Sequence, residues 1–434
     1  MKHQHRRAAF AALPSNKVVS WLGLLCLAAI VETRVHAAEP APLSLRAAID
    51  ATLQANPQLD VYRFREAALD GLRVTANLQP PLQVTAGVEN AFGSGDLKLF
   101  DSAELTLSLS QVIELGEQRA ARVGVSGQRM DLLRAEERVT ELDLLAEVTR
   151  RFIATAAAQE QFTLLQRASA LAQQTLDALQ PLVTAGQTPA SEQARATAAL
   201  QRARLNEAHA QATLTAATIN LSSMWASLTP EFSAVNAELR QVGEAGTLTD
   251  LLPGLDTNPD LLMFASEERL LDAQLQQATS EQRGTVQWTA GIRHLRELND
   301  TGFVFGVSMP LGSRVRSAGA IASAQANFQG VASRREIALN RMRSQLAGLH
   351  LQLTQAILEV NTLRNAVLPQ LDNAQEQTRS AYLSGRYSYV ELVSAQAEYL
   401  DAELALINAA TDAHLLRTEI ERLSGAALIP ETIP

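Results

Sequence analysis

The stretch "AELTLSLSQVIELGEQRAAR", residues 103–122, changes its periodicity halfway along. In its first half, apolar residues (Ala103, Leu105, Leu107, Leu109) alternate with polar ones (Glu104, Thr106, Ser108, Ser110). Alternation of period two predicts a strand with one apolar face. From Gln118 the pattern predicts a helix that continues to about Val183, on the order of 100 Å at 1.5 Å per residue. Strands are therefore expected to lead directly into very long helices.

Three runs of the chain contain neither glycine nor proline: 128–180, 190–229 and 386–424. Helical patterns much longer than about 25 residues are typical of coiled coils or helical repeats. In the first run, apolar residues recur at steps of three and four, as a packed seam requires: Val139, Leu142, Leu145, Val148 and Phe152.

The two halves of the chain resemble each other. "ANPQL" (55–59) recurs as "TNPDL" (257–261), "VTAGV" (84–88) recurs as "WTAGI" (288–292), and Gly186 corresponds to Gly385. Three matches in the same order, each about 200 residues apart, predict a duplication. The first repeat is expected at 39–242, with strands near 82–92 and 102–112 and a helical hairpin near 117–229. The second is expected at 243–434, with strands near 285–295 and 301–310 and a hairpin near 313–424.

Residues 1–38 have the pattern of a secretory signal peptide. Basic residues precede a mostly apolar segment at 18–31, and Ala37 and Ala38 follow as small residues at a cleavage site. Cys26, the only cysteine, lies in that segment. The mature chain is therefore expected to contain neither disulfides nor thiolate chemistry.

Composition and motifs exclude several classes of function. A formal net charge of −9 disfavours nucleic acid as a partner. Only 4% of residues are aromatic although 47% are hydrophobic, which suits thin helical layers better than a bulky enzyme core. No nucleophile–base pair, phosphate loop or zinc spacing is present, and the histidines after the signal (His209, His294, His350, His414) are far apart. We expect neither an enzyme nor a resident cofactor or metal.

The four predicted strands have the length of tilted strands that cross a membrane. Four strands cannot close a barrel, and an open edge in lipid leaves backbone groups unpaired. Several chains would therefore have to share one barrel. The alternative is a pair of soluble hairpins half-buried on a layer of helices.

These features together resemble the TolC-type outer-membrane efflux proteins, and the resemblance covers about residues 43–427. It implies a mainly α fold in which three chains share a twelve-stranded β-barrel, four strands per chain, continued by an α-helical barrel. It also implies a passive exit duct in the outer membrane of a diderm bacterium, with its helices in the periplasm. The implied partners are two further copies, a periplasmic adaptor (membrane fusion) protein, an inner-membrane proton-driven efflux pump and outer-membrane lipid.

Two motifs suggest the cargo. "ENAFGSG" (89–95) and the 103–122 stretch resemble the outer-membrane component of cobalt–zinc–cadmium resistance pumps. Those proteins usually have a glycine-lysine-arginine step after "ELG", whereas this chain has Glu117-Gln118-Arg119. The resemblance implies export of heavy-metal cations. The alternatives are a duct for drugs or organic compounds and, from another class, a structural or adhesive coiled-coil protein of the envelope.

The same resemblance implies that the hairpin tips close the periplasmic entrance. The family's tyrosine corresponds to Tyr382, its acidic positions to Glu192 and Glu391, and its arginine to Tyr387, beside Arg386. The family's second acid on the later hairpin corresponds to Ser394. Residues on the polar faces of the strands are candidates for the barrel lumen: Glu89, Glu104 and Arg293.

Helix capping offers another interpretation of the tips. Ser388 and Glu391 fit a capping box at the start of a helix. Thr188 before Pro189 fits an N-cap followed by proline at the first helical position, and Gly186 and Gly385 can end the preceding helices in a left-handed conformation. Glu391 can serve as a cap, as part of an acidic ring, or as both.

Overall fold

The computed structural model describes residues 41–97 and 99–425, which belong to one compact unit. The predicted signal peptide, with Cys26, lies outside the described residues. Among the helices of the described part, none is both long enough and apolar enough to span a membrane.

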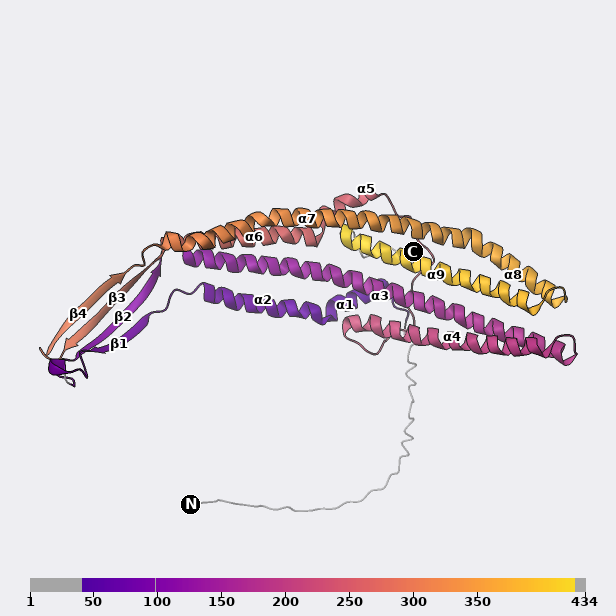
Figure 1. Cartoon of the computed structure of the whole chain (residues 1–434), viewed down its shortest axis with the longest axis horizontal. Coiled ribbons are helices and arrows are strands. Elements are labelled where there is room, and N and C mark those ends of the chain that lie inside the picture. The colour runs from indigo at the N-terminus through magenta and orange to yellow at the C-terminus, as the bar shows by residue number, and fades with distance from the viewer. Residues whose placement is uncertain (1–40, 98, 426–434) are drawn as a thin grey trace, which may run out of the picture. The chain divides into compact units, whose positions relative to one another are not determined.

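A four-stranded antiparallel sheet lies at one end of the described unit (Figure 1). Its strands, in sheet order, are β1 (Gln83–Glu89), β2 (Glu104–Glu114), β3 (Thr285–Leu295) and β4 (Asp300–Ser308). The central pair, β2 and β3, joins the two halves of the sequence, with Ser110 opposite Thr289. Within the described residues, the outer edges of β1 and β4 have no strand partner.

Two strand ends differ from the sequence-based prediction. β1 ends at Glu89 rather than near residue 92, because Asn90 and Phe92 have left-handed backbones (φ 55° and 59°) that a strand cannot continue. β2 continues past residue 112, because Glu114 still pairs with Thr285 on β3.

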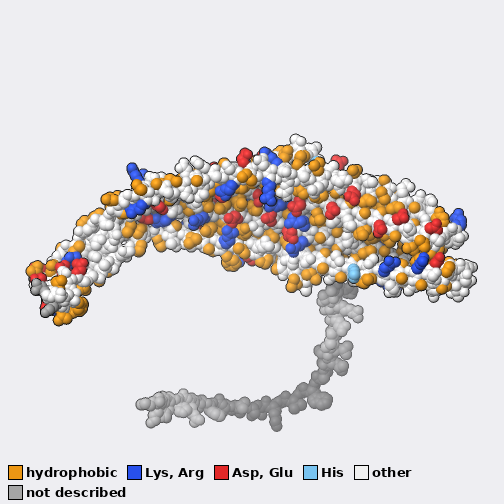
Figure 2. All heavy atoms as spheres, viewed as in Figure 1, with side chains coloured by type: hydrophobic (Ala, Val, Ile, Leu, Met, Phe, Trp, Pro, Cys, Tyr) orange, Lys and Arg blue, Asp and Glu red, His pale blue; other side chains and the backbone are white. Residues whose placement is uncertain are grey.

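The two faces of the sheet differ in chemistry. One face carries polar or small residues, and the other carries Leu, Val, Ile and Phe. Large side chains on the apolar face are exposed, with Phe303 at 95% and Phe305 at 75%. On the side shown in Figure 2, charged groups cover the helices and the far end of the sheet but are sparse along the strands between. This exposed apolar face indicates a surface made for an apolar surrounding or a partner.

Two helical hairpins extend away from the sheet (Figure 1). The first contains α3 (Gln118–Thr184), 67 residues long, and α4 (Ala190–Ser222). It ends earlier than the expected residue 229, because the 3₁₀ turn η2 (Ser223–Trp225) closes it. The second contains α7 (Ser313–Thr362), α8 (Leu368–Leu383) and α9 (Tyr389–Ser424).

A π-helical turn, η5 (Leu363–Val367), separates α7 from α8. Its wider register appears in the bond from the Leu368 N–H to the Leu363 carbonyl. Pro369 follows immediately and has no N–H to donate, so the regular bond to the carbonyl four residues earlier cannot form. The helical hairpin predicted near 313–424 did not include this interruption.

Shorter elements complete the unit. Helices α1 (Leu45–Ala55), α2 (Pro57–Ala76) and α6 (Pro259–Ser280) lie along the long helices. The connection between the halves contains α5 (Leu248–Leu251) and η3 (Leu252–Thr257), while η1 (Gly95–Leu97) and η4 (Glu281–Arg283) adjoin the sheet strands.

The largest core cluster lies between α1, α3 and α9. Val148 and Phe152 of α3 are buried in it together with Leu406 and Ile407 of α9. Alanines such as Ala410 fill the remaining space, so the helices approach closely around few large side chains. A second cluster, which includes Leu346 and Ile420, packs α7 against α9 and η3.

Candidate functional site: the hairpin tips

At the first tip, between α3 and α4, the chain reverses direction at Gly186. Its φ of +70° is accessible to glycine at little cost. The N–H of Gln187 bonds to the Leu182 carbonyl (2.9 Å), which caps the end of α3. The predicted role of Thr188 as N-cap is wrong. α4 begins at Ala190, so Pro189 occupies the cap position with an extended backbone and no side-chain hydrogen bond.

The second tip reverses direction at Gly385 (φ +72°) and restarts at Ser388. The Glu391 N–H donates to Ser388 Oγ (3.4 Å), while Glu391 Oε2 accepts from the Ser388 N–H (2.7 Å) and hydroxyl (2.9 Å). This is a complete capping box. The backbone N–H of Ser388, and then its hydroxyl, lower the pKa of Glu391 below its usual value.

A small apolar cluster joins the two tips. Tyr389, 4% exposed, packs with Leu179 of α3 and Ala196 of α4, and Tyr382, Leu176 and Val393 border these residues. Burial, followed by the Glu192 carboxylate, raises the pKa of both Tyr382 and Tyr389. The Tyr382 hydroxyl is buried and has no hydrogen-bond partner among the described residues.

The structure thus divides the sequence-predicted tip residues into two groups. Glu192 and Tyr382 lie together at the junction of the two hairpins. Arg386, Tyr387 and Glu391 are exposed at the second tip, where Arg386 Nε donates to Ser384 Oγ (3.0 Å). Sequence reasoning missed Tyr389, although its spacing of three and four residues from Leu392 and Val393 is that of a buried helix face.

At the opposite end of the unit, the three polar-face candidates form one ion network. Arg293 contacts Glu89 (3.2 Å) and Glu104 (2.9 Å), and its Nε donates to Thr106 Oγ1 (3.0 Å). Asn90 donates to the other oxygen of Glu104 (2.8 Å). The network therefore links β1, β2 and β3 on the polar face of the sheet.

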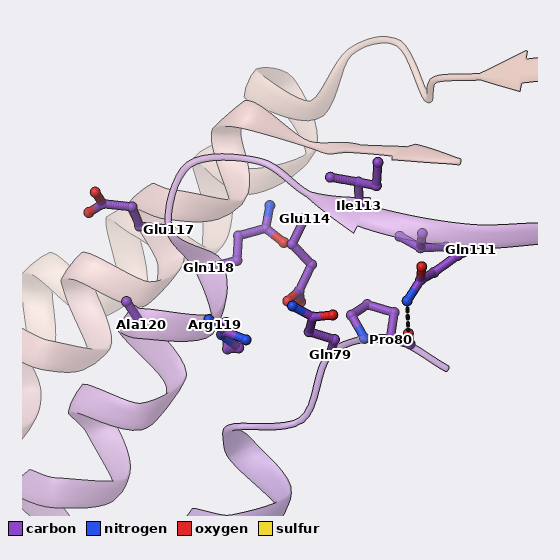
Figure 3. Close-up of a pocket in the computed structure, with 10 residues that line it drawn as sticks. Gln79, Pro80, Gln111, Ile113, Glu114, Glu117, Gln118, Arg119 and Ala120 are labelled. Carbon is purple, nitrogen blue, oxygen red and sulfur yellow. Dashed lines mark hydrogen bonds between the residues drawn. The ribbon is translucent and has the colours of Figure 1, made fainter. Parts of the chain in front are cut away.

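A cavity of about 360 Å³ lies where the strands meet the helices (Figure 3). Gln111 donates to the Pro80 carbonyl there (3.0 Å), and Glu114 pairs with Arg122. Glu117, at the start of α3, points away from the other labelled side chains. These two contacts link β2 to the segment before β1 and to α3. Across the described part of the chain, no group of three or more His, Cys, Asp or Glu side chains is arranged to hold a metal ion.

Comparisons with known proteins give consistent results. The family described as "Outer membrane efflux protein" matches residues 48–227. The cobalt-zinc-cadmium resistance protein CzcC of Cupriavidus metallidurans is 23% identical over 389 residues, covering 88% of this chain and 90% of CzcC. The nickel and cobalt resistance protein CnrC of the same species is 28% identical over 319 residues, covering 72% of this chain and 75% of CnrC.

Solved structures show the same fold. CusC superposes with a TM-score of 0.72 at 14% identity, covering 88% of this chain and 92% of CusC. The MtrE outer membrane channel of Neisseria gonorrhoeae superposes with a TM-score of 0.69 at 19% identity, covering 88% and 89%.

Strands at one end and two long helical hairpins leading from them define the TolC-type fold. The chain matches the outer membrane efflux protein family over residues 48–227 and is similar to CzcC over 88% of its length. It is an efflux channel of the outer membrane, with its helical part in the periplasm.

Proposed function

We propose that the chain forms a homotrimeric, passive exit duct that completes a tripartite pump for heavy-metal cations of the cobalt, zinc and cadmium type. The match to CzcC over almost the full length of both chains carries the choice of cargo. The work of transport comes from an inner-membrane proton-driven pump, which a periplasmic adaptor connects to the duct.

The exposed edges of the chain support the trimer. Among the residues that the structure describes, β1 and β4 each have a free edge, and three copies would supply twelve strands that close a shared sheet. The helices that adjoin these strands in the sequence also have exposed apolar side chains, including Phe64 and Val74 on α2 and Leu351 and Leu358 on α7. α2 leads into β1 and α7 follows β4, so these helices continue from the two strands whose edges the copies would join.

The tips serve as the periplasmic entrance and docking surface in this proposal. The side chains of Leu383, Tyr387 and Val390 are 65%, 48% and 56% exposed at the second tip, where an adaptor would bind apolar groups. Glu192, beside the tyrosine cluster, supplies one carboxylate per chain. Three such carboxylates around an axis form an acidic ring that favours cations.

Gene deletion tests the cargo. In a host without a redundant channel, the deletion strain is expected to become sensitive to cobalt, zinc and cadmium, and the wild-type gene should restore growth. Antibiotics and detergents form the comparison panel. Unchanged metal tolerance together with new antibiotic sensitivity would assign the duct to organic compounds instead.

Single-channel recording tests the entrance. We expect a preference for cations that Glu192→Gln reduces, because the substitution removes three carboxylates from the ring. Glu238→Gln, at an exposed position in the segment that connects η2 to α5, is the matched control. A wild-type channel that passes cations and anions equally would refute the ring.

A further inference from the structure

Charged residues are distributed unequally between the two ends of the sheet. The segments at the end that adjoins the helices (73–83, 111–125, 280–288 and 308–320) contain six arginines and three glutamates. The segments at the opposite end (89–104 and 293–301) contain six acidic and three basic residues. The positive end leads into the helices, and the helical part is periplasmic, so this end lies at the periplasmic side of the membrane.

Contacts around Gly284 bring several of these arginines together. Its carbonyl accepts from Gln118 Nε2 at the start of α3 (2.8 Å), and a methyl group added at Gly284 would lie 2.7 Å from Ser313 Oγ at the start of α7. A methyl group at Gly116 would clash with the Arg283 side chain, which therefore lies against the turn before α3. We call the four arginines beside these contacts the arginine collar: Arg119, Arg283, Arg314 and Arg316.

The guanidinium groups of the arginine collar are available to a ligand. All four residues are exposed, and within the described part of the chain none of them forms an ion pair. Arg316 Nη2 donates to the Leu311 carbonyl (2.8 Å), which uses one of five guanidinium donors. Figure 2 shows basic side chains on the surface where the strands pass into the helices.

Acidic side chains offset only part of this charge. Glu114 is paired with Arg122, which is outside the collar. The other two glutamates of these segments, Glu117 and Glu281, are exposed. The four arginines of the collar therefore exceed the acids around them, and the surface keeps a net positive charge.

The apolar face of the sheet reaches the arginine collar. Leu82, Ile113 and Met309 continue its alternation at the ends of β1, β2 and β4, and each is about half exposed. Beyond β4, Leu311 and Val315 are 84% and 82% exposed. Exposed apolar groups bordered by arginines are typical of a surface at the boundary between lipid chains and headgroups, where long basic side chains extend toward the polar layer.

We propose that the arginine collar binds the headgroups of anionic phospholipids in the periplasmic leaflet of the outer membrane. A guanidinium group donates two parallel hydrogen bonds to phosphate oxygens. Its free positive charge favours headgroups with a net negative charge over zwitterionic ones. The first turns of α3 and α7 begin in the collar and add the positive ends of two helix dipoles. The collar thereby fixes the depth of the sheet in the bilayer.

Spin-labelled lipids test the arginine collar. The purified protein is reconstituted in phosphatidylcholine bilayers that contain a trace of phosphatidylglycerol or of phosphatidylcholine, labelled on the same acyl-chain carbon. Electron paramagnetic resonance gives the fraction of each label that the protein immobilises. We expect a preference of about two- to fivefold for phosphatidylglycerol, because one arginine near an anionic surface gives about fivefold at its own site and other boundary sites give none. High salt should weaken the preference.

A charge-matched pair of variants locates the preference. Arg119→Gln, Arg314→Gln and Arg316→Gln, combined in one protein, should bring the preference close to one. The control combines Arg335→Gln, Arg341→Gln and Arg343→Gln, which remove three exposed arginines of α7 at least about 30 Å from its start at 1.5 Å per residue. Circular dichroism and assembly size show that each variant folds. If the collar triple variant does not assemble, Arg314→Gln alone replaces it and should lower the preference in part.

Three results would overturn the arginine collar. They are equal immobilisation of the two lipids by the wild type, an equal loss of preference in the control variant, or an undiminished preference in the collar variant. The inference uses the membrane location of the protein and not its proposed cargo. Because the readout is lipid binding without metal, a collar that fails leaves the proposed function intact. An intact lipid preference in a protein without metal export would contradict the proposed cargo alone.

Discussion

At the scale of single residues, two adjacent residues of the second tip have different structural roles. Ser388 restarts the helix, and Tyr389 buries the junction between the hairpins. The glycine bends and the Ser388–Glu391 pattern can be read from sequence because capping depends on local backbone groups. The burial of Tyr389 cannot, because its partners Leu179 and Ala196 come from the other hairpin.

The capping box gives a prediction for stability near the tip. Ser388→Ala should raise the local opening rate of the first turn of α9, because an N-cap contributes about 1 kcal/mol. Amide hydrogen exchange at Glu391, corrected for intrinsic rates, measures it. Ser394→Ala, exposed on the same helix, is the control. Equal protection in both variants would show that the cap contributes nothing.

The same carboxylate predicts a pH dependence. The pKa of Glu391 is lowered in the folded state by the Ser388 N–H and hydroxyl. Its contribution is therefore complete above the unfolded pKa and is lost as the pH falls through the lower folded pKa. Protection of the first turn should decrease in acid in the wild type. In Glu391→Gln, which cannot ionise, that decrease should be absent; an identical acid profile would contradict the assignment.

At the scale of elements, a buried asparagine ties the start of each repeat to the end of its hairpin. Asn56 Oδ1 accepts from the Gln58 N–H (2.9 Å) and its amide donates to the Met224 carbonyl (2.8 Å). Asn258 accepts from the Asp260 N–H (2.8 Å) and donates to Leu423 (2.9 Å). This double role gives a physical reason for the recurrence of "NP" in the two halves.

Asn258→Ala should therefore destabilise the protein by about 2–4 kcal/mol, from a lost N-cap and buried carbonyls left without a donor. Chemical unfolding of the purified protein in detergent measures the loss. Asn206→Ala, at an exposed position of α4, should change the midpoint little. If both variants unfold at the same denaturant concentration, the bonds to the hairpin end carry no net stability.

Period-two alternation predicted the strands, and the runs without glycine or proline predicted the long helices. Val148 and Phe152 of the expected seam are buried, but Leu142 is only partly so, because α3 changes neighbours along its length. The π turn escaped prediction, because Pro369 indicates an interruption but not whether the helix kinks, stops or widens its register. The end of β1 differs from its predicted position because the left-handed backbones of Asn90 and Phe92 end the strand at Glu89.

At the scale of the whole molecule, the alternating pattern of the strands is compatible with two surroundings for their apolar face. That face can contact membrane lipid, or it can pack on a layer of helices. No helix of the described residues covers that face, and Phe303 and Phe305 are among its most exposed side chains. Sequence alone could not decide this, because the same alternation also describes a strand packed on its own chain.

Placement of that face in lipid yields the last prediction. Phe305→Lys puts a charge on the apolar face, which costs about 2–4 kcal/mol per chain near the middle of a membrane. Thr289→Lys puts the same charge on the polar face, opposite Ser110. Assembled protein recovered from the outer-membrane fraction should fall sharply for Phe305→Lys, which adds three charges to the proposed trimer, and remain near wild type for Thr289→Lys. Equal recovery of the two variants would mean that lipid does not contact this face.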